Sequence, residues 1–266
     1  MLRDITIGQY FPGKSLLHRM DPRMKIVLTI VYIILLFVAS NWMGFAVAIV
    51  YLAAAISLSQ IPLKLIVKGV KPILPLIIFT SVLNMFFVDG HAVFQIGFFK
   101  LTYEGILLAI KMTVRIVCLI MGTSLLTYTT SPIALTDAIE RLLKPLNKVH
   151  FPVHEMAMMM TIALRFIPTL IEETDKIMSA QKARGADMES GNLLQRAKAL
   201  VPILIPLFIS AFRRAEELAL AMECRCYRGG EGRTRMRQLF LQPMDFYMAG
   251  VTLVCFAAII GFNIIF

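Results

Sequence analysis

Apolar runs that approach the thickness of a bilayer are the feature that most constrains this sequence. Residues 26–39, 43–58, 72–88, 105–128 and 244–266 are almost entirely apolar, whereas shorter, interrupted stripes fill the core of a soluble domain. A membrane-spanning helix needs about 20 such residues to cross about 30 Å of hydrocarbon. Because 58% of the residues are hydrophobic and only 17% are charged, we predict an all-α integral membrane protein with about five transmembrane helices.

The positive charge of the chain predicts its orientation in the membrane. The formal net charge is +10, and basic residues precede the first apolar run. Lys64, Lys68 and Lys71 lie between the second and third runs without a neighbouring acid. Basic loops stay in the cytoplasm, so the N-terminus is predicted to be cytoplasmic and, after five crossings, the C-terminus extracellular. Membrane orientation explains the charge without a nucleic-acid partner.

The sequence divides into three predicted regions. Residues 1–130 form an N-terminal membrane domain with four transmembrane helices, and residues 244–266 form a C-terminal transmembrane helix. Between them, residues 131–243 carry charges spread along amphipathic patterns and are predicted to be cytoplasmic. This region holds two long helices, predicted at about 153–183 and 193–227.

Two cations interrupt the fourth apolar run. Lys111 and Arg115 lie four residues apart and therefore share one face of the predicted helix. Charges inside a span mark either a polar functional contact or a structural one, such as snorkelling or an ion pair. The structural interpretation is favoured, and a path for ions through the chain stays open as an alternative.

Both long amphipathic helices end in an arginine between two small residues. The first triplet is Ala183-Arg184-Gly185 and the second is Cys224-Arg225-Cys226. Small flanking side chains let a partner's surface close around the guanidinium, which can bond carboxylates or carbonyls through two N–H groups at once. Basic residues near helix C-termini can also simply offset the helix dipole. Because the pattern occurs twice, we predict that both triplets are docking sites.

The chain resembles the T component of energy-coupling factor transporters, a branch of the ABC importers. The resemblance covers essentially the whole chain. It rests on five motifs: Gly-Gln-Tyr at 8–10, His-Arg-Met-Asp-Pro-Arg-Met-Lys at 18–25, Leu-Arg-Phe-Ile-Pro at 164–168, Ala-Arg-Gly at 183–185 and Ala-Met-Glu-Cys-Arg at 221–225.

This resemblance implies a non-catalytic scaffold in a bacterial cell membrane. Arg184 and Arg225 would each insert into one of two cytoplasmic ABC ATPase subunits, of the A and A′ types. The long helices would pass the motion of the ATPases to a membrane-embedded S component that binds a vitamin or another micronutrient. The chain itself would bind no cofactor and no metal, and ATP with Mg²⁺ would bind to the ATPases.

The second triplet departs from the family pattern. Cys226 stands where Gly would occur, and Cys lacks the freedom of Gly at positive φ, so the backbone after Arg225 is the point of difference. Cys224 and Cys226 also suggest a metal site, but no nearby cluster offers further ligands. His18, His91, His150 and His154 show no convincing ligand pattern.

Two alternatives from other classes remain open. The first is an integral membrane enzyme, which would need a polar catalytic cluster such as one around His154 and Glu155. We find no phosphate-binding loop and no metalloprotease or serine-hydrolase motif in the sequence. The second is an autonomous channel or secondary transporter that uses Lys111 and Arg115, although the paired arginines would then have no purpose.

Overall fold

The chain forms two compact units. The bundle unit comprises residues 9–138 and 238–266, and the crossed-helix unit comprises residues 1–8 and 139–237. The computed structural model describes residues 10–88, 91–96, 99–149, 151–186, 192–230 and 239–265. Gly8 and Gln9 of the first motif lie outside these ranges, as do Gly191 and the basic residues Arg233, Arg235 and Arg237.

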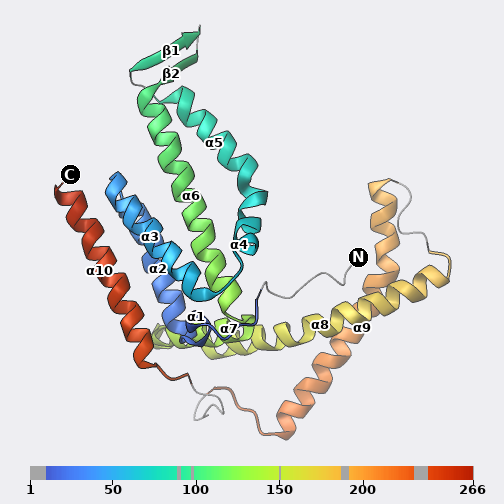
Figure 1. Ribbon diagram of the computed structural model, residues 1–266. Helices are drawn as coiled ribbons and strands as arrows, with labels where there is room; N and C mark the ends of the chain where they lie inside the picture. The colour runs from blue at the N-terminus through green and yellow to red at the C-terminus, as the bar shows by residue number, and fades with distance from the viewer. Residues whose placement is uncertain are drawn as a thin grey trace. The chain divides into compact units, whose positions relative to one another are not determined.

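Helices make up most of the bundle unit (Figure 1). Helix α7 begins in this unit and ends in the other one. In chain order the elements are α1 (Leu16–Arg19), α2 (Pro22–Val38), α3 (Trp42–Ser59), α4 (Leu63–Val70), the 3-10 helix η1 (Lys71–Ile73), α5 (Leu74–Phe87), β1 (Ala92–Ile96), β2 (Phe99–Thr102), α6 (Tyr103–Thr129), α7 (Pro132–Leu143) and α10 (Pro243–Ile265).

Four helical segments among the described residues are long and apolar enough to cross a bilayer. They are Trp42–Ser59, Leu63–Phe87, Tyr103–Thr129 and Pro243–Asn263. The first predicted span corresponds to α2, whose 17 residues make it about 26 Å long at 1.5 Å per residue. The prediction of an all-α membrane protein is confirmed, with four candidate spans among the described residues where about five were predicted, because α2 is shorter than these four.

Two local features differ from the sequence prediction. Residues 63–71, which lie between the second and third predicted spans, form α4 and the start of η1, so an apolar helical segment begins at Leu63, before the predicted start at residue 72. Between α5 and α6, β1 and β2 pair as an antiparallel hairpin, which Figure 1 shows at the end of these helices. The strands are too short for a period-two pattern to distinguish them from a polar loop.

Helix α6 is the centre of the bundle unit and packs against α2, α3, α4 and α5, while α10 packs against α2 and α3. The α6 backbone approaches α2 at Gly122, where a Cβ atom would lie 2.4 Å from Cε1 of Tyr32. The buried core around this contact is apolar and comes from α2, α3, α4, α6 and α10, with members that include Leu35, Leu36, Phe45, Ala48, Leu52, Ile66, Leu125, Tyr128 and Ile259.

The crossed-helix unit is dominated by two long helices. The unit contains the 3-10 helix η2 (Lys144–Val149), α8 (Val153–Ala183) and α9 (Leu193–Cys224). Figure 1 shows α8 and α9 crossing, with their C-terminal ends pointing apart. The predicted start and end of the first long helix are confirmed, and the second ends three residues before the predicted Tyr227.

We predict that Gly122→Ala lowers the stability of the bundle unit by about 1 to 3 kcal/mol, since an added methyl group would overpack the contact with Tyr32. The thermal midpoint of the detergent-solubilised protein, followed by circular dichroism, measures the change. Gly250→Ala in α10 is the matched control, because its Cβ would meet no atom within 4 Å. Equal midpoints for the two variants would contradict the packing argument.

Candidate functional site

The first arginine triplet forms the C-terminal cap of α8. Arg184 is the cap residue, and Gly185 follows with a positive φ of 84°. The N–H of Gly185 donates to the carbonyl of Lys182 at 3.0 Å, and the N–H of Ala186 donates to that of Gln181 at 3.0 Å. This pair of hydrogen bonds is a Schellman motif. It ends the helix sharply and leaves Ala183, Arg184 and Gly185 exposed.

The second triplet forms the same cap on α9. Arg225 has φ −92° and ψ 14°, close to the −86° and 5° of Arg184. The N–H groups of Cys226 and Tyr227 donate to the carbonyls of Glu223 at 2.8 Å and Met222 at 3.0 Å. Cys226 adopts a φ of 55°. The backbone after Arg225 therefore keeps the conformation that Gly gives the first triplet, although a non-Gly residue occupies it.

Both guanidinium groups are exposed. Within the described residues, the ion pairs and side-chain hydrogen bonds involve neither Arg184 nor Arg225. Cys224 and Cys226 are also exposed, with free thiols. No group of three potential metal-ligating side chains occurs in the described part of the chain. The structure thus places each triplet at its own helix end and does not bring the two together.

A polar contact joins α8 and α9 where they cross. The Glu173 carboxylate of α8 accepts hydrogen bonds from the Ser210 hydroxyl and, at 3.0 Å, from the Arg214 guanidinium of α9. Nearer the end of α8, the Gln181 side chain donates to the carbonyl of Pro202 at 3.2 Å. That carbonyl lies four residues before Pro206, which has no N–H to bond it. These hydrogen bonds therefore join the two helices at their crossing, away from Arg225.

The chain that leaves α9 packs against the start of α8. At Gly230, a Cβ atom would lie 2.4 Å from the His154 ring, so only glycine fits this close approach. His154 Nδ1 lies 3.1 Å from a Glu140 carboxylate oxygen. His154 is, with Glu155, a candidate residue for the enzyme alternative. In the structure His154 packs against Gly230 and pairs with Glu140 within the crossed-helix unit.

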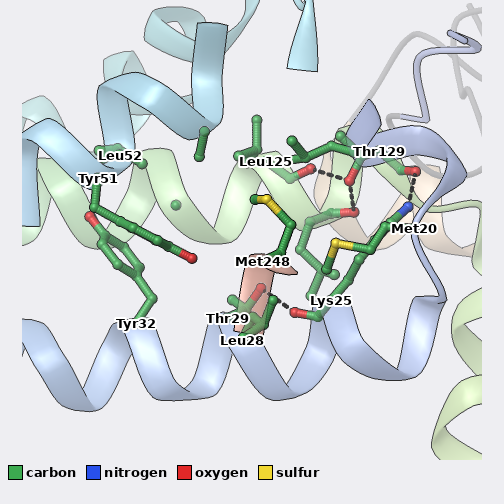
Figure 2. Close-up of a pocket in the computed structure, with 14 residues that line it drawn as sticks. Met20, Lys25, Leu28, Thr29, Tyr32, Tyr51, Leu52, Leu125, Thr129 and Met248 are labelled. Carbon is green, nitrogen blue, oxygen red and sulfur yellow. Dashed lines mark hydrogen bonds between the residues drawn. The ribbon is translucent and has the colours of Figure 1, made fainter. Parts of the chain in front are cut away.

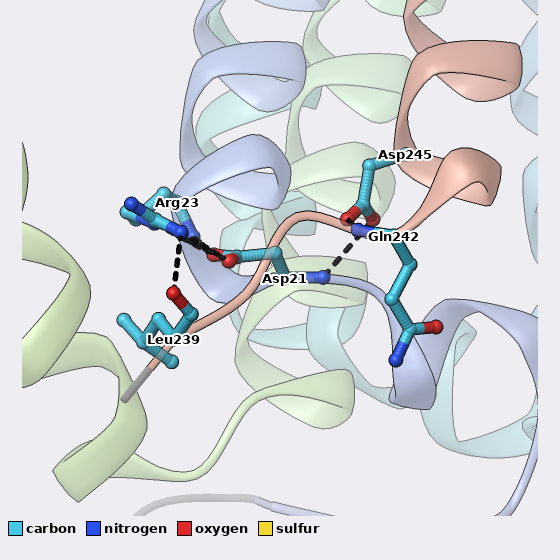
Figure 3. Close-up of polar contacts among 5 residues, drawn as sticks. All are labelled: Asp21, Arg23, Leu239, Gln242 and Asp245. Carbon is cyan, nitrogen blue, oxygen red and sulfur yellow. Dashed lines mark hydrogen bonds and ion pairs between the residues drawn. The ribbon is translucent and has the colours of Figure 1, made fainter. Parts of the chain in front are cut away.

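A buried carboxylate cluster joins the starts of α2 and α10 in the bundle unit (Figure 3). Asp245, which is fully buried, accepts the N–H groups of Asp21 at 3.1 Å and Gln242 at 2.8 Å. Asp21 in turn caps α2 and pairs with Arg23 at 2.7 Å. Arg23 also donates to the carbonyl of Leu239 at 3.2 Å. We call these residues the Asp clasp; it anchors the chain that enters α10.

Lys25 is the last residue of the motif at 18–25, which also contains Asp21 and Arg23, and it joins α2 to the ends of α1 and α6. Its buried ammonium donates to the carbonyls of Thr129 at 2.9 Å and His18 at 3.3 Å. Lys25 lines a cavity of about 60 Å³ together with Thr29, Tyr32 and other residues of α2, α3 and α6 (Figure 2). The Lys25 nitrogen points to backbone carbonyls rather than to a carboxylate, so this cavity holds no acid–base pair.

The two cations of the fourth apolar run cap the C-terminal end of α2. Lys111 donates to the carbonyl of Ser40 at 3.1 Å, and Arg115 donates to that of Ala39 at 3.0 Å. Arg115 also lies 5.2 Å from the centre of the Phe45 ring. The last carbonyls of a helix have no partner inside the helix. These contacts support the structural interpretation and leave the channel alternative without its proposed path.

The sequence did not predict the Asp clasp, the contact of Lys25 with Thr129, or the hydrogen bonds of Lys111 and Arg115 at the C-terminal end of α2. The motif at 18–25 supplied Asp21, Arg23 and Lys25, and the Asp-Pro pair at 21–22 is a recognisable helix start. No local signal identified their partners Thr129, Leu239 and Asp245, which are more than 100 residues away in sequence.

We predict that Cys226→Gly raises the stability of the crossed-helix unit by about 0.5 to 1 kcal/mol. Relief of the left-handed strain, worth about 1 to 2 kcal/mol, is partly offset by the greater freedom of Gly in the unfolded chain. Gly185→Ala should lower the stability by about 1 kcal/mol for the opposite reason. Denaturant unfolding in detergent measures both, and a destabilising Cys226→Gly would contradict the shared cap geometry.

A second prediction concerns the Asp clasp. Asp245→Ala leaves the buried N–H group of Asp21 without an acceptor, at about 1 to 3 kcal/mol, and also removes the acceptor of the partly buried N–H group of Gln242. Asp245→Asn keeps one side-chain carbonyl and should cost less. Unfolding midpoints in the order wild type, Asn, Ala would support the role of this carboxylate, and indistinguishable midpoints for Ala and wild type would refute it.

Comparison with known proteins shows similarity along the entire chain. Residues 13–236 match the family described as CbiQ, cobalt transport protein. The chain is 55% identical over 266 residues to the energy-coupling factor transporter transmembrane protein EcfT of Ruminiclostridium cellulolyticum, and the alignment covers both chains completely. The EcfT proteins of Thermosediminibacter oceani (58% identity, 92% of both chains) and Bacillus subtilis (48% identity, 98% of this chain and 99% of the other) are also similar.

Proposed function

The chain belongs to the CbiQ cobalt transport protein family, and on this basis we propose that it couples ATP hydrolysis by partner subunits to substrate uptake. This membership confirms the resemblance drawn from the sequence. The chain is a membrane protein and the transmembrane component of an energy-coupling factor transporter. In our proposal, two cytoplasmic ABC ATPases bind ATP and Mg²⁺, and a separate S component carries the vitamin or other micronutrient.

The repeated helix cap is the observation that carries this proposal. Arg184 and Arg225 occupy the same position of the same Schellman motif, and both are exposed between small side chains. The Schellman cap itself is common at helix ends, whereas an exposed arginine at the same position of both caps is the feature that two partners would require. Two matched guanidinium groups on two helix ends suit two related partners, each offering carboxylates or carbonyls in a groove.

The crossing of α8 and α9 suggests how motion would be transmitted. Helix α8 has 31 residues, about 46 Å at 1.5 Å per residue. Glu173 ties it to Ser210 and Arg214 of α9 partway along both helices. When the ATPases close on ATP, they would move the two arginine ends relative to each other, and the braced crossing would pass this motion to the S component.

The membrane topology of the proposal follows from the charges. Lys64, Lys68 and Lys71 are exposed on α4 and η1, and basic segments stay in the cytoplasm. We therefore propose a cytoplasmic N-terminus, an extracellular β1–β2 hairpin and an extracellular C-terminus. The spans at 1–130 and 244–266 form the membrane part in this proposal, and the helices within 131–243 form the cytoplasmic coupling part.

We predict that Arg184→Ala and Arg225→Ala each weaken binding of the ATPases, and that the double variant abolishes transport. Truncating one member of a buried, hydrogen-bonded charge pair at an interface costs about 2 to 5 kcal/mol. Arg→Lys variants should be impaired as well, because lysine lacks the planar fork. Pull-down of the ATPases from detergent extracts and ATP-dependent uptake in proteoliposomes measure the two effects.

Lys176→Ala is the matched control, since it removes an exposed positive charge from α8 away from the helix end. It should bind the ATPases and support transport like wild type. The double arginine variant must still reach the membrane and keep its thermal midpoint. Unchanged pull-down and transport in that variant would refute the docking assignment.

A further inference from the structure

We propose that the bundle unit binds an anionic phospholipid in a groove between α3 and α6, beside the start of α4. The acyl chain would occupy the groove and the lysines of α4 would hold the phosphate. This inference goes beyond the coupling function and requires only that the bundle unit lies in a bilayer. Placing the lipid in the cytoplasmic leaflet rests on the proposed topology.

The groove has the size and the chemistry for an acyl chain. Its volume is about 600 Å³, within the range of ~300 to 1,000 Å³ usual for ligand sites. Apolar side chains make up most of its lining, and the few polar ones include Ser57, Gln60 and Thr113. The hydroxyls of Ser57 and Thr113 already bond Ala53 and Ser81, respectively. Little in the groove would therefore compete with a hydrocarbon chain.

Basic side chains lie beside the rim of this groove. Leu63 at the start of α4 lines it, and Lys64 is the next residue. Lys64, Lys68 and Lys71 recur at spacings of four and three, so they lie along one face of the helical segment, and all three are exposed. Within the described residues, no carboxylate forms an ion pair with them.

The amphipathic character of α4 places this rim at the membrane interface. Leu63 and Val67 are 60% and 55% exposed, and they lie one position before Lys64 and Lys68. A helix with an exposed apolar stripe beside a lysine stripe lies at the boundary between headgroups and acyl chains. Lysines at that level attract anionic headgroups, so the charge favours a phospholipid over an uncharged span of a partner protein.

The anchoring of α4 makes the groove a preformed site. Ile66 is fully buried, and the carbonyl of Leu65 accepts the Tyr128 hydroxyl of α6 at 3.2 Å. A Cβ atom at Gly69 would lie 3.3 Å from the Ser124 hydroxyl, so α4 lies close to α6. The lysines are therefore held at a fixed height on α4, whose first residue, Leu63, lines the groove.

A single-tryptophan reporter in the full-length chain tests this proposal. Trp42 is the only tryptophan, so Trp42→Phe combined with Leu63→Trp places the sole reporter at the rim. The protein is reconstituted in phosphatidylcholine vesicles that contain phosphatidylglycerol or phosphatidylcholine with brominated acyl chains. Brominated phosphatidylglycerol should quench the fluorescence at about tenfold lower mole fraction, given the attraction of two lysines for an anionic headgroup.

Neutralising the lysines should remove this preference. Lys64→Gln with Lys68→Gln should make the two brominated lipids quench equally. The matched control, Lys14→Gln with Lys148→Gln, removes the same charge from exposed positions elsewhere and should keep the tenfold preference. Equal quenching by both lipids before any neutralisation would overturn the proposal, as would loss of the preference in the control.

A variant that fills the groove distinguishes binding of a lipid in the groove from attraction of headgroups by the lysines alone. Ala53→Phe should reduce quenching by both lipids, because Ala53 lines the groove. A phosphatidylglycerol preference that survives in the filled groove would show that the lysines attract headgroups without a bound acyl chain, and the proposed site would be wrong. No ATPase or S component enters this experiment, so its failure is distinct from a failure of the coupling proposal.

Discussion

The pairing of backbone groups at helix ends is the constraint on which this structure depends. Every helix leaves four carbonyls and four N–H groups without partners inside the helix, and those that are buried need partners elsewhere in the protein. In the bundle unit, Lys111 and Arg115 satisfy carbonyls at the C-terminal end of α2. Asp21 and Asp245 accept N–H groups at the starts of α2 and α10. Charged residues in an apolar protein thus stabilise helix ends.

In the crossed-helix unit, backbone N–H groups bond the carbonyls at the C-terminal ends of the two long helices. Schellman hydrogen bonds at Gly185 and Cys226 consume the carbonyls near the ends of α8 and α9, so Arg184 and Arg225 are not needed for capping. Their guanidinium groups remain exposed for a partner. Arginine occupies the same cap position of two helices, and among the described residues its side chain forms no ion pair or hydrogen bond at either. This repetition favours the proposed binding of two related ATPases over a general effect on the helix dipole.

Much of the secondary structure could be predicted because its signals are local. Bilayer-length apolar runs predicted the spans, and the stripe of α8 predicted its bounds. The β1–β2 hairpin and α4 were missed because each is too short for a periodic pattern to stand out. The position of the arginine triplets at helix ends was predictable from the flanking small residues, whereas the left-handed conformation of Cys226 was not, since Gly is the usual residue there.

The sequence by itself determined that this protein lies in a membrane, how long its main helices are, and that two of them end at an arginine. Apolar run length and helical periodicity depend only on neighbouring residues. Only the tertiary structure decided what the buried charges do. Lys111 and Asp245 become caps because segments more than 70 residues away bring backbone groups to them. The same holds for the groove beside α4, which exists only because α3 and α6, far apart in sequence, lie together and line it.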